Sequence, residues 1–169
     1  MTWQMSPPGK FSKSYLRQWA KEQIAVAVPR QVVSLCLLGT QSFHLTLEQM
    51  QAVSDVEREL SAVMLERNLT GIELEKAGQL DEAVTLYEQN VTDWFTGNHP
   101  YDRLRIIYTK RGQYSDAVRV CRSFVHVDDE LIRSGFRCSH PNPKRDRFAE
   151  WAEKLASKIA PGQDKETHP

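Results

Sequence analysis

The feature that most constrains the fold of this 169-residue chain is a repeat with a period of 34 residues. Residues 71–87 realign on residues 105–121, with the same kinds of side chain at several positions. The matched pairs include Gly78 with Gly112, Ala83 with Ala117, and Tyr87 with Cys121. A fixed period of this length is typical of stacked helix–turn–helix units, which bury a continuous core between neighbours. The sequence therefore predicts an all-α fold built from packed pairs of antiparallel helices.

Local signals outside the repeat also favour helices. Pro7, Pro8 and Gly9 indicate a flexible arm, and Ser12 is placed to cap the first helix. The run Val32–Leu38 suits either a strand or two turns of helix, and helix is favoured because no second strand candidate exists to pair with it. The expected organisation is an arm at 1–11, one helical domain at 12–160 and a tail at 161–169. Within that domain we expect N-terminal helices at 12–62, two repeat units at 63–131 and a capping helix at 143–160.

Capping residues and glycines give the expected helix boundaries. Thr46 with Gln49 resembles a capping box, and the apolar pattern after it continues to residue 77 without proline. This segment is either one long helix or two helices broken near 68–70. The glycines of the repeat permit tight turns between further helices. We expect those helices at about 81–94, 100–111 and 115–133, with Ser115 capping the third and Asn142-Pro143 starting the last helix.

The repeat resembles the tetratricopeptide repeat family over residues 63–131, about two fifths of the chain. Small residues, glycines and large apolar residues fall at that family's spacing in both units. The matching residues are Gly71, Leu74, Gly78, Ala83 and Tyr87, then Tyr101, Leu104, Tyr108, Gly112, Ala117 and Cys121. The departures are Arg67 where an aromatic residue is usual, and Arg105, Asn90 and Phe124 where small residues are usual.

The resemblance implies a right-handed superhelix with a groove that binds a peptide segment. It implies a non-catalytic scaffold or adaptor whose partner is a protein or peptide. The residues at the family's groove positions are Met64, Asn68, Ile72, Glu75, Lys76, His99, Asp102, Ile106, Thr109 and Lys110. Ile72 and Ile106 are expected to anchor the segment by apolar contact, and the polar residues to orient it. Some members of the family grip a peptide's terminal carboxylate with lysines and asparagines, and that residue set is absent here.

Charge distribution leaves two other functions open. Residues 44–99 carry three basic and eleven acidic side chains, and residues 100–147 carry eleven basic and six acidic ones. Neighbouring helices can attract through these charges, or acidic and basic ends of separate copies can assemble into a homo-oligomer. A basic segment could instead bind an anion or nucleic acid at the start of the last helix. Its residues are Arg133, Arg137, Lys144, Arg145 and Arg147.

Composition and motifs argue against the other classes of function. The formal net charge is zero, which favours neither a nucleic-acid nor a membrane partner. No phosphate-binding loop or nucleophile motif is present, so we expect no enzymatic activity and no cofactor. Cys121, His126, Cys138 and His140 lack the paired spacing of zinc sites, so no metal is expected. The odd number of cysteines and the lack of a long apolar stretch favour a cytoplasmic protein.

Overall fold

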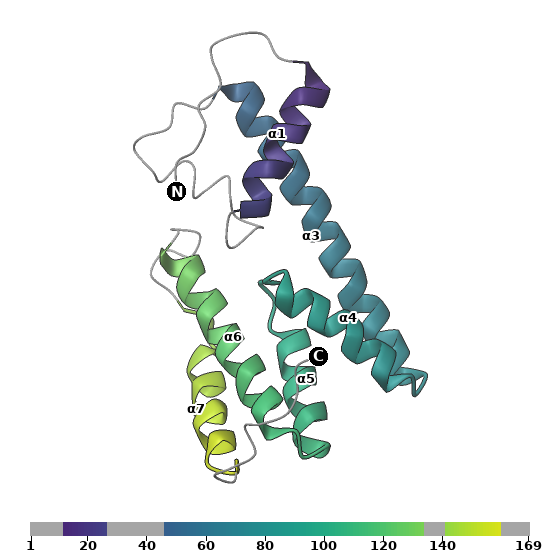
Figure 1. Cartoon of the computed structure of the whole chain (residues 1–169), viewed down its shortest axis with the longest axis vertical. Helices are drawn as coiled ribbons and strands as arrows, with labels where there is room; N and C mark the ends of the chain where they lie inside the picture. The colour runs from purple at the N-terminus through teal and green to yellow at the C-terminus, as the bar shows by residue number, and fades with distance from the viewer. Residues whose placement is uncertain (1–11, 27–45, 134–140, 160–169) are drawn as a thin grey trace.

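The computed structural model describes residues 12–26, 46–133 and 141–159, and these residues form helices and no strand (Figure 1). The helices are α1 (Lys13–Val26), α3 (Leu47–Lys76), α4 (Leu80–Thr92), α5 (His99–Lys110), α6 (Tyr114–Arg133) and α7 (Arg145–Ala156). The prediction of an all-α fold is confirmed for the described part of the chain. The predictions for the arm at 1–11, the run Val32–Leu38 and the tail at 161–169 lie outside it.

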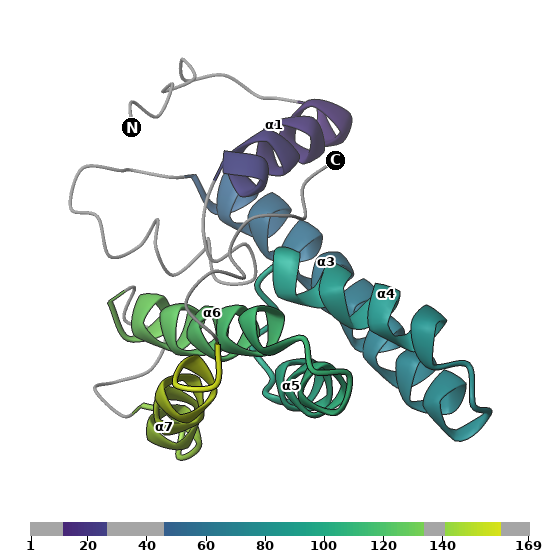
Figure 2. The same ribbon diagram turned by 60° about the horizontal axis from the view of Figure 1, so that its bottom comes forward.

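From α3 onward, each described helix packs against the next one along the chain. α4 lies beside α3, α5 beside α4, α6 beside α5 and α7 beside α6, as two views show (Figures 1 and 2). Large aromatic side chains fill the interior of this stack. The most buried are Tyr87, Tyr101, Phe124 and Phe148. Short turns between antiparallel helices bring sequence neighbours together in space, so consecutive packing is the expected outcome.

The helix α3 is continuous over 30 residues, so the alternative of a break near 68–70 is wrong. Its N-terminus has the predicted capping box: Thr46 Oγ1 accepts the Gln49 N–H at 3.2 Å, and Gln49 Oε1 accepts the Thr46 N–H at 3.0 Å. A helix of this length extends about 45 Å. Its first half packs on α1 and its second half on α4. The α1 contact is a small separate core of Trp19, Ala20, Val53 and Val56.

The turns of the two units have the same backbone geometry. Gly78 and Gly112 have φ angles of 81° and 73°, in the left-handed region that favours glycine. In the first turn, the N–H groups of Gly78 and Gln79 donate to the carbonyls of Glu75 and Leu74 at 3.1 and 2.9 Å. The same bonds recur 34 residues later, from Gly112 and Gln113 to Thr109 and Tyr108, at 3.2 and 2.9 Å. The sequence period is therefore a structural period at these turns.

The first unit depends on a close approach between α3 and α4 at Gly71. A Cβ atom added to Gly71 would lie 2.5 Å from a carbon of the Tyr87 ring, well inside van der Waals contact. In the second unit the large and the small side chain change places: Arg105 corresponds to Gly71, and Cys121 corresponds to Tyr87. The small Cys121 is buried in the core, while the guanidinium of Arg105 lies 3.7 Å from the centroid of the Trp151 ring on α7.

Helix starts confirm one capping prediction and correct another. Ser12 Oγ accepts the N–H of Tyr15 at 3.2 Å, which confirms Ser12 as the cap of α1. α6 begins at Tyr114, so Ser115 lies inside the first turn and does not cap the helix. Both α4 and α6 begin two residues after the glycine of the preceding turn. The turn geometry, and not the serine, therefore sets the start of α6.

The start of α7 also differs from the prediction. The helix begins at Arg145, so the expectation that Asn142-Pro143 would start it is wrong. Asn142 instead donates its backbone N–H to Oδ2 of Asp128 at 2.8 Å, and its side chain accepts the N–H of Lys144 at 3.0 Å. Asp128 is a buried carboxylate on α6. This long-range bond fixes the segment before α7, and the helix begins only after it.

The close approach at Gly71 gives a stability prediction. Replacing Gly71 with alanine should destabilise the fold by about 1–3 kcal/mol, because α3 and α4 must separate or the Tyr87 ring must move. Urea unfolding followed by circular dichroism measures this change. Thr70→Ala is the matched control, since Thr70 is exposed on the same helix and the change should have little effect. Equal stabilities of the two variants would contradict the close approach.

Candidate functional site

Two helix faces that repeat with the 34-residue period carry half of the predicted groove residues, namely Ile72, Lys76, His99, Ile106 and Lys110. On α3, the positions 65, 69, 72 and 76 are spaced so that they share one face. The corresponding positions on α5 are 99, 103, 106 and 110. We call the two sets the paired stripes: Leu65, Leu69, Ile72 and Lys76 on α3, and His99, Arg103, Ile106 and Lys110 on α5. Each unit therefore offers a stripe with a lysine at its C-terminal end.

Polar side chains join α3 to α5, and two of them, His99 and Arg103, belong to the α5 stripe. His99 Nδ1 lies 2.9 Å from Oδ1 of Asn68. The guanidinium of Arg103 donates to both carboxylate oxygens of Glu75, at 2.6 Å from Nη2 and 2.9 Å from Nε. The hydroxyl of Tyr87 donates to the same carboxylate at 3.0 Å. Three of the predicted site residues, Asn68, Glu75 and His99, are thus brought together, and Arg103 is a partner that the sequence analysis missed.

The electrostatics of this network favour a charged Glu75 and a neutral His99. The hydrogen bonds from Arg103 hold the pKa of Glu75 below its ordinary value. Burial raises the pKa of the Tyr87 hydroxyl, and its bond to Glu75 raises it further. The pKa of His99 is lowered, first by burial and then by the positive charge of Arg103. Near neutral pH the network therefore holds one closed ion pair and an uncharged imidazole.

The apolar residues of the paired stripes are exposed or partly exposed to solvent. Leu65 and Leu69 are 51% and 54% exposed, and Ile72 and Ile106 are half-buried. The sequence analysis placed Met64 in the groove, but Met64 is fully buried, and its carbonyl accepts the Asn90 side-chain amide at 2.9 Å. The residue that corresponds to His99 is Leu65, one position further along.

The other predicted groove residues have local partners. Asp102 pairs with Arg105 at 2.7 Å, and the Thr109 hydroxyl donates to the Arg105 carbonyl at 2.7 Å. Lys76 pairs with Glu73 at 2.8 Å on the exposed surface. Lys110 is exposed, and it has no ion-pair partner among the residues that the structure describes. Asp102 and Thr109 are thus engaged within their own helix, whereas the two lysines remain accessible.

The basic segment that could bind an anion is partly neutralised by neighbouring acids. Arg145 pairs with Asp129 at 2.7 Å and with Asp146 at 3.1 Å. Arg133 pairs with Glu130, and the guanidinium of Arg147 lies 4.8 Å from the Trp151 ring centroid. Lys144 is exposed. Arg137 lies outside the described residues.

Ion pairs between the units account for part of the uneven charge distribution. Three of them join an acid of residues 44–99 to an arginine of residues 100–147. These pairs are Glu75 with Arg103, Asp81 with Arg111, and Glu88 with Arg119, at 2.6, 2.6 and 2.7 Å. The acidic and basic halves therefore attract each other within one chain.

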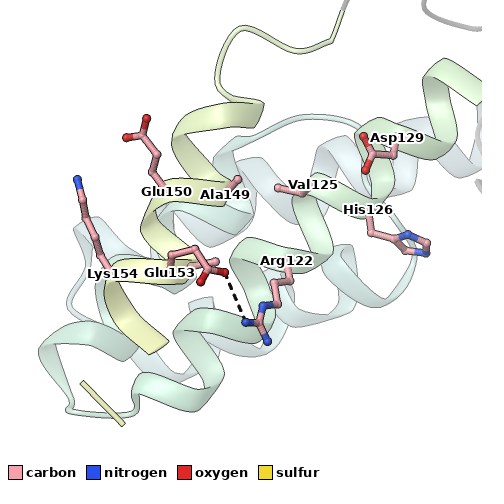
Figure 3. Close-up of a pocket in the computed structure, with 9 residues that line it drawn as sticks. Arg122, Val125, His126, Asp129, Ala149, Glu150, Glu153 and Lys154 are labelled. Carbon is pink, nitrogen blue, oxygen red and sulfur yellow. Dashed lines mark ion pairs between the residues drawn. The ribbon is translucent and has the colours of Figure 1, made fainter. Parts of the chain in front are cut away.

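A shallow hollow of about 690 Å³ lies between α6 and α7 (Figure 3). Val125, Ala149 and Ala152 supply its apolar surface. Charged side chains surround it, and Arg122 approaches Glu153 across it at 3.7 Å. The residues that line the hollow include no serine, threonine or cysteine, and the groups around it carry mixed charge. Its apolar surface can accept an apolar side chain.

Other chemical groups in the described part of the chain give no second site. The free Cys121 is buried, and burial raises the pKa of its thiol to about 12, so the thiol stays protonated. No group of three or more His, Cys, Asp or Glu side chains within residues 12–26, 46–133 and 141–159 is placed to hold a metal ion. Over the same residues, no helix combines the length and apolar character needed to cross a membrane.

Comparisons of the chain with protein-family models, with curated proteins and with solved structures found no significant match.

The lowered pKa of His99 predicts a pH dependence of stability. The folded protein binds this proton less readily than the unfolded chain, whose histidine has the ordinary value of 6.5. The contribution of neutral His99 is therefore present above about pH 6.5 and is lost as the pH falls through the lower folded value. The free energy of unfolding, measured between about pH 7.5 and 5.5, should fall more for the wild type than for His99→Gln. Parallel curves would contradict this role for His99.

The Glu75–Arg103 pair should couple α3 and α5 energetically. A double-mutant cycle with Glu75→Gln and Arg103→Gln should give about 1–2 kcal/mol of coupling, because the Glu75 side chain is only 15% exposed. The matched control is the Arg17–Glu59 pair, which has similar geometry but side chains 49% and 52% exposed. Its coupling should be clearly smaller, because solvent screens an exposed pair. A control pair that couples as strongly as Glu75 and Arg103 would be inconsistent with the partly buried interhelical role of that pair.

Proposed function

We propose that this protein is a non-catalytic scaffold or adaptor that binds a peptide segment of another protein on the paired stripes. The observation that supports this most directly is the exposure of Leu65 and Leu69, each more than half accessible, on the same face of α3 as half-buried Ile72. Half-buried Ile106 holds the corresponding place on α5. Contiguous exposed apolar residues with a polar surround are typical of protein interaction sites. The segment would anchor its apolar side chains there.

We also propose that the helices form a right-handed superhelix of the tetratricopeptide type. The recurrence of the glycine turns with their hydrogen bonds supports this arrangement, as does the packing of each helix from α3 onward on the next. In such a superhelix the first helices of successive units, here α3 and α5, line one surface. The paired stripes would then form one continuous binding surface. A cytoplasmic location, expected from the sequence, belongs to the same proposal.

Self-assembly and anion binding have less support. Assembly of copies through opposite charges would need acidic and basic groups, and three of each are already paired with one another within the chain. Neighbouring carboxylates already neutralise Arg133 and Arg145. Anion or nucleic-acid binding would show affinity that falls steeply with salt, whereas a surface with apolar anchors should be much less sensitive.

A random peptide library displayed on phage tests the proposed function. Peptides selected on the full chain should lose at least about tenfold in affinity for Leu69→Asp, since 1.4 kcal/mol of lost apolar contact is a factor of ten. Val63→Asp is the matched control, because Val63 is an apolar residue of the same helix, 45% exposed, outside the paired stripes. Peptides that bind both variants as tightly as the wild type would refute binding on the paired stripes.

A further inference from the structure

The paired stripes contain four apolar residues, and each stripe ends in a lysine. Leu65, Leu69, Ile72 and Ile106 make the apolar part. Lys76 and Lys110 follow at the ends of α3 and α5, in the last turn of each helix. The lysines are 34 residues apart and therefore occupy the same place in the two units. On α5, His99 and Arg103 precede Ile106, and Arg103 is paired with Glu75. The feature that recurs in both units is an isoleucine followed four residues later by a lysine.

The charge at the lysine end is not cancelled by nearby buried groups. Glu75, the closest carboxylate in sequence to Lys76, is engaged by Arg103 and by the Tyr87 hydroxyl. Lys76 contacts Glu73 through a pair whose side chains are 66% and 71% exposed, where solvent leaves little net attraction. Lys110 has no ion-pair partner among the described residues. The carboxylates of a bound molecule would therefore find one available ammonium group at the end of each stripe.

Both lysines also complement the negative ends of their own helix dipoles. A lysine at any position in the last turn would interact favourably with the dipole. The dipole therefore does not explain why both lysines lie in line with the apolar residues of the stripes. Their alignment with Leu69, Ile72 and Ile106 is the observation that favours a shared ligand.

We propose that the bound segment is apolar at one end and acidic at the other. Its apolar side chains contact Leu65, Leu69, Ile72 and Ile106, and its aspartate or glutamate carboxylates contact Lys76 and Lys110. This rests on the proposed function and specifies the partner. Ile72 and Lys76, like Ile106 and Lys110, are separated by about 6 Å along the helix axis. An extended segment covers that distance in about two residues and then presents the same face, so acidic residues should lie about two positions from the last apolar anchor.

Selections from the random peptide library on charge-reversed variants test this partner. The wild-type chain should enrich peptides that contain two apolar residues and, on one side of them, an Asp or Glu at that spacing from the nearer apolar residue. The double variant Lys76→Glu/Lys110→Glu should enrich Lys or Arg at the same places, and it should bind the wild-type peptides at least about tenfold more weakly. Lys154→Glu is the matched control, because Lys154 is an exposed lysine in the last turn of α7. It should select the same peptides as the wild type.

The outcomes separate the two proposals. Peptides that are sensitive to Leu69→Asp but show no acidic preference would overturn the acidic partner and leave the proposed function standing. A wild-type chain that enriches no peptide would overturn both. Sedimentation would then show whether a second copy covers the paired stripes, as a dimer that Leu69→Asp disperses. Circular dichroism and thermal unfolding of each variant must match the wild type, since all four substituted residues, Leu69, Lys76, Lys110 and Lys154, are exposed.

Discussion

The contact between Gly71 and Tyr87 is the constraint on which the arrangement of the first unit and the site depends. Because Gly71 has no Cβ, the Tyr87 ring lies directly against α3, where an alanine would leave only 2.5 Å. The ring then places its hydroxyl 3.0 Å from Glu75, and Glu75 in turn holds Arg103 of α5. The close approach between α3 and α4 therefore positions the Tyr87 hydroxyl on Glu75, and the Glu75 carboxylate in turn positions α5 of the next unit.

The same chain of contacts decides which groups are left for binding. Glu75 and Arg103 neutralise each other at low exposure, and His99 stays uncharged beside Asn68. These polar groups are partly buried and already paired, so a ligand that took one partner would leave the other unsatisfied, at a cost in free energy. The side chains of Leu65 and Leu69 are apolar and exposed, so a ligand can cover them without breaking a polar contact. Binding on this face would therefore use apolar contacts and the two outer lysines, with the polar network keeping α3 and α5 in register.

Some of this could be predicted from the sequence because the signals are local. The capping box at Thr46 depends on residues three apart, and the turns at Gly78 and Gly112 depend on a backbone conformation that glycine favours. The start of α7 could not be predicted, because it is set by a bond from Asn142 to the buried Asp128, 14 residues earlier. The partnership of Arg103 with Glu75, 28 residues apart, was missed for the same reason. Assigning Met64 instead of Leu65 was an error of one residue, which on a helix is a rotation of about 100° from the buried side to the open side.

The central claim is that the exposed faces of α3 and α5 act as one binding surface. Methyl NMR of the full chain, with a selected peptide added in steps, tests it most directly. The methyl signals of Leu65, Leu69, Ile72 and Ile106 should shift together with a single dissociation constant, while those of Val63 and of Val125 in the α6–α7 hollow should stay unchanged. Shifts confined to Val125 and its neighbours, or shifts of the α3 residues without Ile106, would contradict a shared surface.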